Sequence, residues 1–307
     1  MSDIQGRSEK SKFQSILTEL SEKLSGSELN RFLLELFRKR AKRISLAELF
    51  HQFEKNRFTA PSTVETIEFK ELELSCLRLA KQRDFELVTL SPLTALATCS
   101  AFGFVDQNNV VSALRGTEVL SDATNVFALL IAGKLKKDRT ISMIKLATTH
   151  RHVRSQLPLN PMFTAHFGVF CMATGGRDLG NFAFEIGNLI DHLELHSLAL
   201  LKHFPADKLF VRIFLKNDNS AFREKLKDAL AASNIRIQTD LGTELNPGNY
   251  YQFVQFRFFL KHKGSDINLS DGGFVDWTQK LLQNRKQRLL ISGVGIELIS
   301  KIDSDQN

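Results

Sequence analysis

Several residue types are scarce in this chain of 307 residues, and each shortage argues against a class of protein. The three cysteines, Cys76, Cys99 and Cys171, lie far apart without C-x-x-C spacing, which indicates neither a disulfide framework nor a zinc site. Only 17 Gly and 6 Pro argue against collagen-like and low-complexity chains. No apolar run reaches about 18 residues, and the first residues lack the apolar stretch of a signal peptide. We therefore expect a cytoplasmic protein with no membrane segment.

The composition is that of a folded protein with a basic excess. Hydrophobic residues make up 43% of the chain and charged residues 24%, and the 25 Phe against 2 Tyr and 1 Trp indicate aromatic rings used mainly for packing. The net charge is +7, which favours phosphate-bearing or acidic partners. Residues 1–60 hold twelve Lys and Arg against eight Asp and Glu, so over half of the excess lies in this segment. Much of it comes from residues 38–43.

The N-terminal segment has apolar residues at helical spacing. The pattern predicts three amphipathic helices, over residues 13–24, 29–37 and 46–53, and Ser45 with Glu48 resembles a capping box for the third. Pro61 disfavours a helical residue before it, and Ser62 with Glu65 can cap the next helix. We therefore predict a basic helical module over 1–60 and a core over 61–307.

The core alternates helical and strand patterns. A helix of roughly 20 residues should follow the boundary. Further helices are predicted at about 122–135, 179–203, 222–230 and 276–284, and strands at 85–90, 143–148, 166–173, 209–214, 235–237, 250–258 and 289–291. No internal repeat and no glycine-rich phosphate-binding loop is present. The fold class is therefore α+β, rich in strands in its second half.

Four stretches, in order, resemble the catalytic core of class II aminoacyl-tRNA synthetases, and specifically its histidyl branch. Residues 84–93 follow a helix and resemble motif one, and residues 150–156, H-R-H-V-R-S-Q, resemble the F-R-H-E-R-P-Q run of motif two. Residues 246–251, N-P-G-N-Y-Y, are similar to the R-G-L-D-Y-Y pocket signature. The fourth stretch pairs D-G-G-F-V-D at 271–276, similar to G-G-R-Y-D, with S-G-V-G-I-E-L at 292–298, similar to motif three. The segment L-R-G-T-E at 114–118 also resembles the family's L-R-P-E.

The resemblance implies a fold, a site and partners. The fold would be an antiparallel sheet flanked by helices, in a homodimer formed through residues 62–92. Candidate ligands for the phosphates of ATP, with Mg²⁺, are Arg151, Arg154 and His150. Candidates for an amino-acid pocket are Glu118, Gln156, Tyr250, Tyr251, Gly272 and Gly273. The motif-three residues Gly293, Gly295 and Glu297 would be structural.

The departures from the family pattern bear on catalysis. This chain has Val153 where motif two has glutamate, Leu298 where motif three has arginine, and Asn246 and Phe274 where two further arginines stand. Removing one preorganised charged donor typically costs about 2.7 to 4 kcal/mol of transition-state stabilisation. The chain also ends just after motif three, so we expect no anticodon-binding domain. Ordinary tRNA charging is therefore not expected.

Three functions are compatible with this pattern. The first is a non-charging paralogue of histidyl-tRNA synthetase that senses an amino acid and regulates a partner enzyme, similar to the regulatory subunit of ATP phosphoribosyltransferase in histidine biosynthesis. The second is an ATP-dependent ligase that transfers an aminoacyl group to a non-standard acceptor. The third is an RNA-binding adaptor that uses residues 38–43.

Each candidate also has a purely structural explanation. Arg151 and its neighbours would then form a solvated basic turn, and Tyr250 and Tyr251 would pack a strand. His192 and His196 have the i, i+4 spacing of two metal ligands, but no third ligand is evident, so a polar helix face is favoured and no metal is predicted. Residues 38–43 would then be a solvated helix end, where cations suit the helix dipole.

Overall fold

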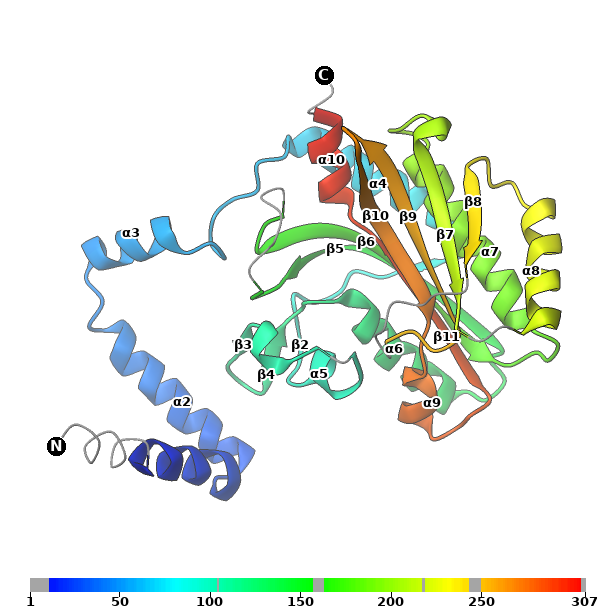
Figure 1. Ribbon diagram of the computed structural model, residues 1–307. Coiled ribbons are helices and arrows are strands. Elements are labelled where there is room, and N and C mark those ends of the chain that lie inside the picture. The colour runs from blue at the N-terminus through cyan, green and yellow to red at the C-terminus, as the bar shows by residue number, and fades with distance from the viewer. Residues whose placement is uncertain (1–10, 104, 157–162, 217–218, 243–249, 305–307) are drawn as a thin grey trace.

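The computed structural model describes residues 11–103, 105–156, 163–216, 219–242 and 250–304, and within them eight strands form one central sheet (Figure 1). In sheet order these are β1 (Glu86–Leu87), β5 (Met143–Val153), β6 (His166–Arg177), β11 (Gln287–Val294), β10 (Ser265–Phe274), β9 (Val254–His262), β7 (Leu209–Leu215) and β8 (Gln238–Gly242). Neighbouring strands are antiparallel except for the pairs β1–β5 and β7–β8 at the two edges. The structure confirms the predicted α+β fold, with a mainly antiparallel sheet flanked by helices.

Helices cover both faces of the sheet because side chains alternate along each strand. In β9, Phe256 and Phe258 pack against His196 of α7, with ring centroids 5.3 and 5.5 Å apart. That face carries the larger apolar core and is covered by α4 (Thr66–Gln82), α7 (Ala183–Leu200), α8 (Ser220–Ala232) and α10 (Ile296–Ser304). The other face carries a second apolar cluster under α6 (Ala123–Lys137) and α9 (Trp277–Leu282). The two helices α6 and α9 leave part of this sheet face uncovered, and a cavity opens there.

A small three-stranded sheet lies between α4 and α6 in the chain. Its order is β2 (Leu93–Ala95), β4 (Thr117–Val119) and β3 (Ser112–Ala113), and α5 (Thr98–Gly103) and the short helix η2 (Gln107–Asn109) accompany it. Glu118 of β4 is fully buried, and its carboxylate accepts hydrogen bonds from the backbone N–H groups of Ala97 and Cys99 at 2.8 and 3.0 Å. This carboxylate therefore caps the start of α5.

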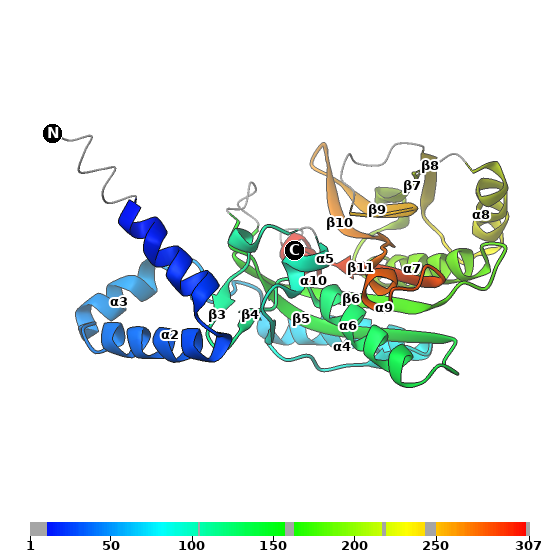
Figure 2. The same ribbon diagram turned by 90° about the horizontal axis from the view of Figure 1, so that it is seen from below.

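The N-terminal helices form an arm that projects away from the central sheet (Figures 1 and 2). The arm consists of a helix over residues 11–18, the π-helical turn η1 (Glu19–Lys23), α2 (Gly26–Ala41) and α3 (Leu46–Lys55). Ser25 and Glu28 form a full capping box for α2, while Ser45 caps α3 by accepting from the N–H of Glu48 at 3.2 Å. No residue of η1, α2 or α3 is buried.

Several sequence predictions need correction. Strand β10 and the small sheet were not predicted, and the strand expected at 235–237 begins only at Gln238. Glu65 itself caps α4 by accepting from Glu68 N–H at 2.8 Å, so the expected cap of Ser62 with Glu65 is wrong. The strand predicted at 250–258 starts at Val254, and the strand predicted at 85–90 covers only two residues. A short helix, η3 (Ala206–Lys208), connects α7 to β7.

Candidate functional site

A cavity of about 690 Å³ opens on the sheet face that α6 only partly covers. Its floor is formed by β6, β11, β10 and β9, and its walls by the start of α6, the end of β5 and Tyr250–Tyr251. A second cavity of about 810 Å³ shares Asn109, Arg154, Gln156, Phe167, Asn268, Leu269 and Gly295 with the first. The two cavities are therefore neighbouring parts of one cleft.

Three acidic side chains line the first cavity, Asp106, Asp122 and Asp271, and Asp106 already accepts from the N–H and side-chain amide of Asn108 at 2.9 and 3.0 Å. Asp122 caps α6, because its Oδ1 accepts from the N–H and hydroxyl of Thr124 at 2.9 and 2.7 Å, and its Oδ2 lies 4.0 Å from Arg154 Nη2. Asp271 of β10 accepts from the Tyr251 hydroxyl at 3.3 Å. Burial, reinforced by the negative charge of Asp122, raises the pKa of Asp271, although Arg257 opposes this shift. A cationic group in the cavity would relieve the repulsion between Asp122 and Asp271.

Two guanidinium groups complement these carboxylates. Arg154 follows β5 directly, and its guanidinium lies 5.3 Å from the ring centroid of Phe167. Arg257 of β9 stands opposite Asp271 in the antiparallel register, on the face away from α7. A planar guanidinium can hold both oxygens of a carboxylate. The cavity thus offers two arginines and three acidic side chains, and groups of both signs suit a zwitterion such as a free amino acid.

The tyrosine wall depends on a glycine. The rings of Tyr250 and Tyr251 contact each other at 4.8 Å between centroids, and Tyr250 packs edge-on against Trp277 at 5.6 Å. A Cβ on Gly273 would lie 2.5 Å from the Tyr251 ring and 2.4 Å from the carbonyl oxygen of Val254. Burial raises the pKa of both tyrosines well above the ordinary value, so their hydroxyls stay protonated.

His152 and Cys171 also line the cavity, but they do not form an activated nucleophile. His152 Nε2 accepts from the Ala123 N–H at 3.0 Å and lies 3.9 Å from Cys171 Sγ. Burial lowers the pKa of His152 to about 3 and raises that of Cys171 well above its ordinary value. The imidazole is therefore neutral and the sulfur is a thiol, whereas nucleophilic catalysis requires a thiolate.

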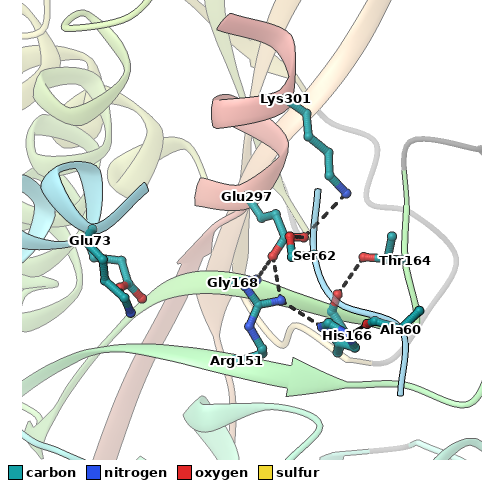
Figure 3. A network of polar contacts seen from close by, with 10 residues as sticks. Ala60, Ser62, Glu73, Arg151, Thr164, His166, Gly168, Glu297 and Lys301 are labelled. Carbon is teal, nitrogen blue, oxygen red and sulfur yellow. Dashed lines mark hydrogen bonds and ion pairs between the residues drawn. The ribbon is translucent and has the colours of Figure 1, made fainter. Parts of the chain in front are cut away.

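Arg151, one of the three predicted phosphate ligands, lies on the opposite face of β5 (Figure 3). Its Nη1 is 2.9 Å from Glu297 Oε2 and 2.8 Å from His166 Nδ1. The Glu297 carboxylate also accepts from Gly168 N–H at 2.9 Å and from the Ser62 hydroxyl at 2.7 Å. In the described part of the chain, Arg151 therefore ties β5 to α10 and lines neither cavity.

The other predicted residues divide between the cavity and the framework. Those that line the cleft are Arg154, Gln156, Tyr250, Tyr251, Gly293, Gly295 and Glu297. His150 lies beside His152, with ring centroids 5.8 Å apart, and Glu118 is held in the small sheet; neither lines the cleft. A Cβ on Gly272 would contact Phe256 and Ser292, on the α7 side. The first four residues of the N-P-G-N-Y-Y signature, 246–249, lie outside the described residues.

The two histidines with metal-ligand spacing form a buried hydrogen-bond chain beneath the sheet. The ring nitrogens of His192 form hydrogen bonds with the hydroxyls of Thr174 at 2.9 Å and Ser292 at 2.8 Å. Those of His196 form hydrogen bonds with the hydroxyls of Ser292 at 2.9 Å and Ser270 at 2.5 Å. All four ring nitrogens are engaged by hydroxyl groups. Among the described residues, no group of three or more His, Cys, Asp or Glu side chains is arranged to hold a metal.

Four charged residues of the cavity, Asp106, Asp122, Asp271 and Arg257, were not predicted as site residues. Asp122 stood only at the start of a predicted helix, Asp271 only within a motif, and Arg257 only within the strand predicted at 250–258. For Arg257 the alternation with Phe256 and Phe258 was a usable signal, because it places this side chain on the face away from the apolar core.

The fold is similar to solved class II synthetase structures. An ATP phosphoribosyltransferase regulatory subunit/histidyl-tRNA synthetase from Bacillus halodurans C matches at 13% identity and TM-score 0.60, over 79% of this chain and 82% of that one. The histidyl-tRNA synthetase of S. aureus matches at 12% identity and TM-score 0.60, over 80% and 70% of the two chains. The RNA-binding domain of threonyl-tRNA synthetase from Cryptosporidium parvum Iowa II matches at 12% identity and TM-score 0.58, over 76% of this chain and 63% of that one. No protein-family model and no curated protein sequence matches the chain.

These similarities confirm the resemblance on which the fold prediction depended. The chain has a class II synthetase-like fold. Identities of 11–13% establish the fold alone. Among the described residues, no helix is long and apolar enough to cross a membrane.

Proposed function

We propose that this chain is a non-charging, amino-acid-binding subunit that regulates a partner enzyme. The observation that carries the proposal is the cavity, in which Asp122 and Asp271 can hold an ammonium group while Arg154 and Arg257 hold a carboxylate. Charges of both signs in one cleft suit a small zwitterion better than a polyanion.

The predicted phosphate ligand Arg151 and the motif-three residues offer ATP and Mg²⁺ a poor fit. Arg151 is already paired with Glu297 on the other face of the sheet, and Leu298 stands at the position of the motif-three arginine. Mg²⁺ prefers carboxylate oxygens, but Glu297 is engaged by Ser62, Gly168 N–H, Arg151 and Lys301. We therefore derive no adenylation step, and binding of ATP stays a prediction for measurement.

The partner is inferred from the fold neighbour that is named as a regulatory subunit. By that analogy the partner is a catalytic subunit of ATP phosphoribosyltransferase, and the bound amino acid would report the supply of histidine. A ligand can shift the partner's activity only by as much as its affinity differs between the active and inactive states of the complex.

A ligase that activates an amino acid is the competing function. One observation supports it: Arg154 belongs to the motif-two stretch and faces both cavities, where it can reach a phosphate. The two functions differ in whether the bound amino acid is converted to an adenylate.

The direct test is a thermal-shift screen with each of the twenty amino acids. At about 100 times its Kd, a ligand stabilises the native state by about 2.7 kcal/mol, which for a chain of this length raises Tm by about 4 °C. At least one amino acid should give this shift, and Asp271→Asn should remove it. Asp266→Asn is the matched control, because Asp266 lies on the same strand but is exposed. No shift with any amino acid, or an equal shift in the Asp271 variant, would contradict the proposal.

A further inference from the structure

The arm presents an apolar surface that no described residue of the chain covers. In α3, Leu46, Leu49, Phe50 and Phe53 follow the i, i+3, i+4, i+7 spacing of one helix face, and Leu46 is 84% exposed and Phe50 64% exposed. The twelve exposed large apolar side chains of the arm are Phe13, Ile16, Leu17, Phe32, Leu34, Leu36, Phe37, Ile44, Leu46, Leu49, Phe50 and Phe53.

Isolated helices of this length are marginal in water, so the arm needs a surface to pack against. If about half of each of these twelve side chains became buried, the apolar area removed from solvent would be roughly 1,000 Å². A stable protein–protein interface needs about 800 Å² from each partner. The arm alone therefore supplies enough apolar area for one side of such an interface.

The base of the arm is fixed to the core beside the cleft. The Arg57 guanidinium donates hydrogen bonds to the carbonyl oxygens of Ser155 and Gln156, and His166 Nε2 donates to the carbonyl of Ala60 at 2.6 Å. The arm therefore projects from a fixed base, and its α2 and α3 lie away from α4 of the same chain (Figures 1 and 2).

Charge indicates what covers the arm. The end of α2 and the turn after it carry Arg38, Lys39, Arg40, Lys42 and Arg43, and the last three form no ion pair among the described residues. Residues 65–73, the N-cap and first half of α4, carry four glutamates against one lysine, with the apolar Ile67 exposed at 65% beside them. Glu68 and Glu71 are exposed and form no ion pair within the described residues.

We propose that the arm of one chain docks on α4 of a second copy, with residues 38–43 against Glu68 and Glu71. The exchange is reciprocal, so two arms and two α4 surfaces are covered in one closed, two-fold symmetric dimer. An RNA or lipid surface would pair with the basic cluster but leave the acidic face of α4 uncompensated. The dimer satisfies both surfaces with groups that the chain itself carries.

The test uses two charge-reversed, full-length variants. Variant one carries Lys42→Glu and Arg43→Glu, and variant two carries Glu68→Lys and Glu71→Lys; all four side chains are exposed, so the fold should persist, as circular dichroism would check. Sedimentation equilibrium at low salt should show a dimer for the native chain and a Kd raised at least about tenfold for each variant, because like charges then face each other. Mixing the two variants should restore dimers, since both contacts are again complementary in the heterodimer.

The other results each overturn the proposal. A native chain that is monomeric, or variants with an unchanged Kd, would show that the arm does not join two copies. If the mixture fails to dimerise while a single chain with all four substitutions regains the native stability, the arm docks on α4 of its own chain. Phe50→Ser should also raise the Kd, with the exposed Gln52→Ala as the control on the same helix. None of these measurements depends on amino-acid binding in the cleft.

Discussion

Gly273 supports the tyrosine wall of the cavity, so replacing it with alanine should damage both stability and binding. The added Cβ would lie 2.4 Å from the carbonyl oxygen of Val254 and 2.5 Å from the Tyr251 ring. The carbonyl belongs to β9, which is held between β7 and β10, so it cannot move away freely. Overpacking of this kind typically costs about 1 to 3 kcal/mol, and we expect a value near 3 because backbone is involved on one side.

Two assays separate this steric effect from a general effect of the substitution. A loss of about 3 kcal/mol corresponds to a fall in Tm of about 5 °C for a chain of this length. The displaced Tyr251 should also weaken amino-acid binding at least about tenfold. Gly187→Ala on α7 is the control, because a Cβ there meets nothing within 4 Å and should stabilise the helix by up to about 1 kcal/mol. An unchanged Tm and unchanged binding in Gly273→Ala would refute the described contact between Gly273 and Tyr251.

Two further predictions concern stability. Burial alone would raise the pKa of Glu297, but hydrogen bonds from Ser62 and Gly168 and the charge of Arg151 leave this pKa below its ordinary value. Glu297→Ala should therefore lower the free energy of unfolding in urea by about 2 to 3 kcal/mol, allowing for the partial exposure of Arg151. Glu297→Gln should cost less because glutamine keeps a side-chain carbonyl oxygen that accepts hydrogen bonds, and equal losses in the two variants would contradict that role. Burial lowers the pKa of His152 and His196 to about 3, so the unfolded state takes up protons first as the pH falls below about 6.5. Stability should therefore be complete above that pH and fall by about 2 kcal/mol per histidine at pH 5; a flat profile from pH 7 to 5 would show that these rings are not buried and neutral.

The strongly patterned elements could be predicted from sequence, and the weakly patterned ones could not. The apolar runs of α6 and β6 made these elements recognisable because most of their side chains are buried. Strand β10 was missed because S-D-I-N-L-S-D-G-G-F is polar and contains two glycines. Its strand conformation comes from pairing with β9 and β11 on its two sides, which a local pattern does not encode.

The candidate site shows the limit of motif matching. The match to motif two gave Arg151, Arg154 and His150 as phosphate candidates, but the alternation of β5 turns Arg151 toward Glu297, and of the three only Arg154 lines the cleft. A shift of one residue in a strand moves a side chain to the other face, so a degenerate motif cannot decide which arginine faces the ligand. Asp122 and Arg257 are far apart in sequence, and only the fold brings them to one cavity.

Pyrophosphate exchange is the most direct test of the central claim that this chain binds an amino acid without activating it. The native chain would be incubated with ATP, Mg²⁺, labelled pyrophosphate and the amino acid that gives the largest thermal shift. We expect saturable binding of that amino acid by calorimetry and no exchange above the background set by Asp271→Asn. Exchange that depends on the amino acid and rises well above that background would contradict the claim and establish a ligase.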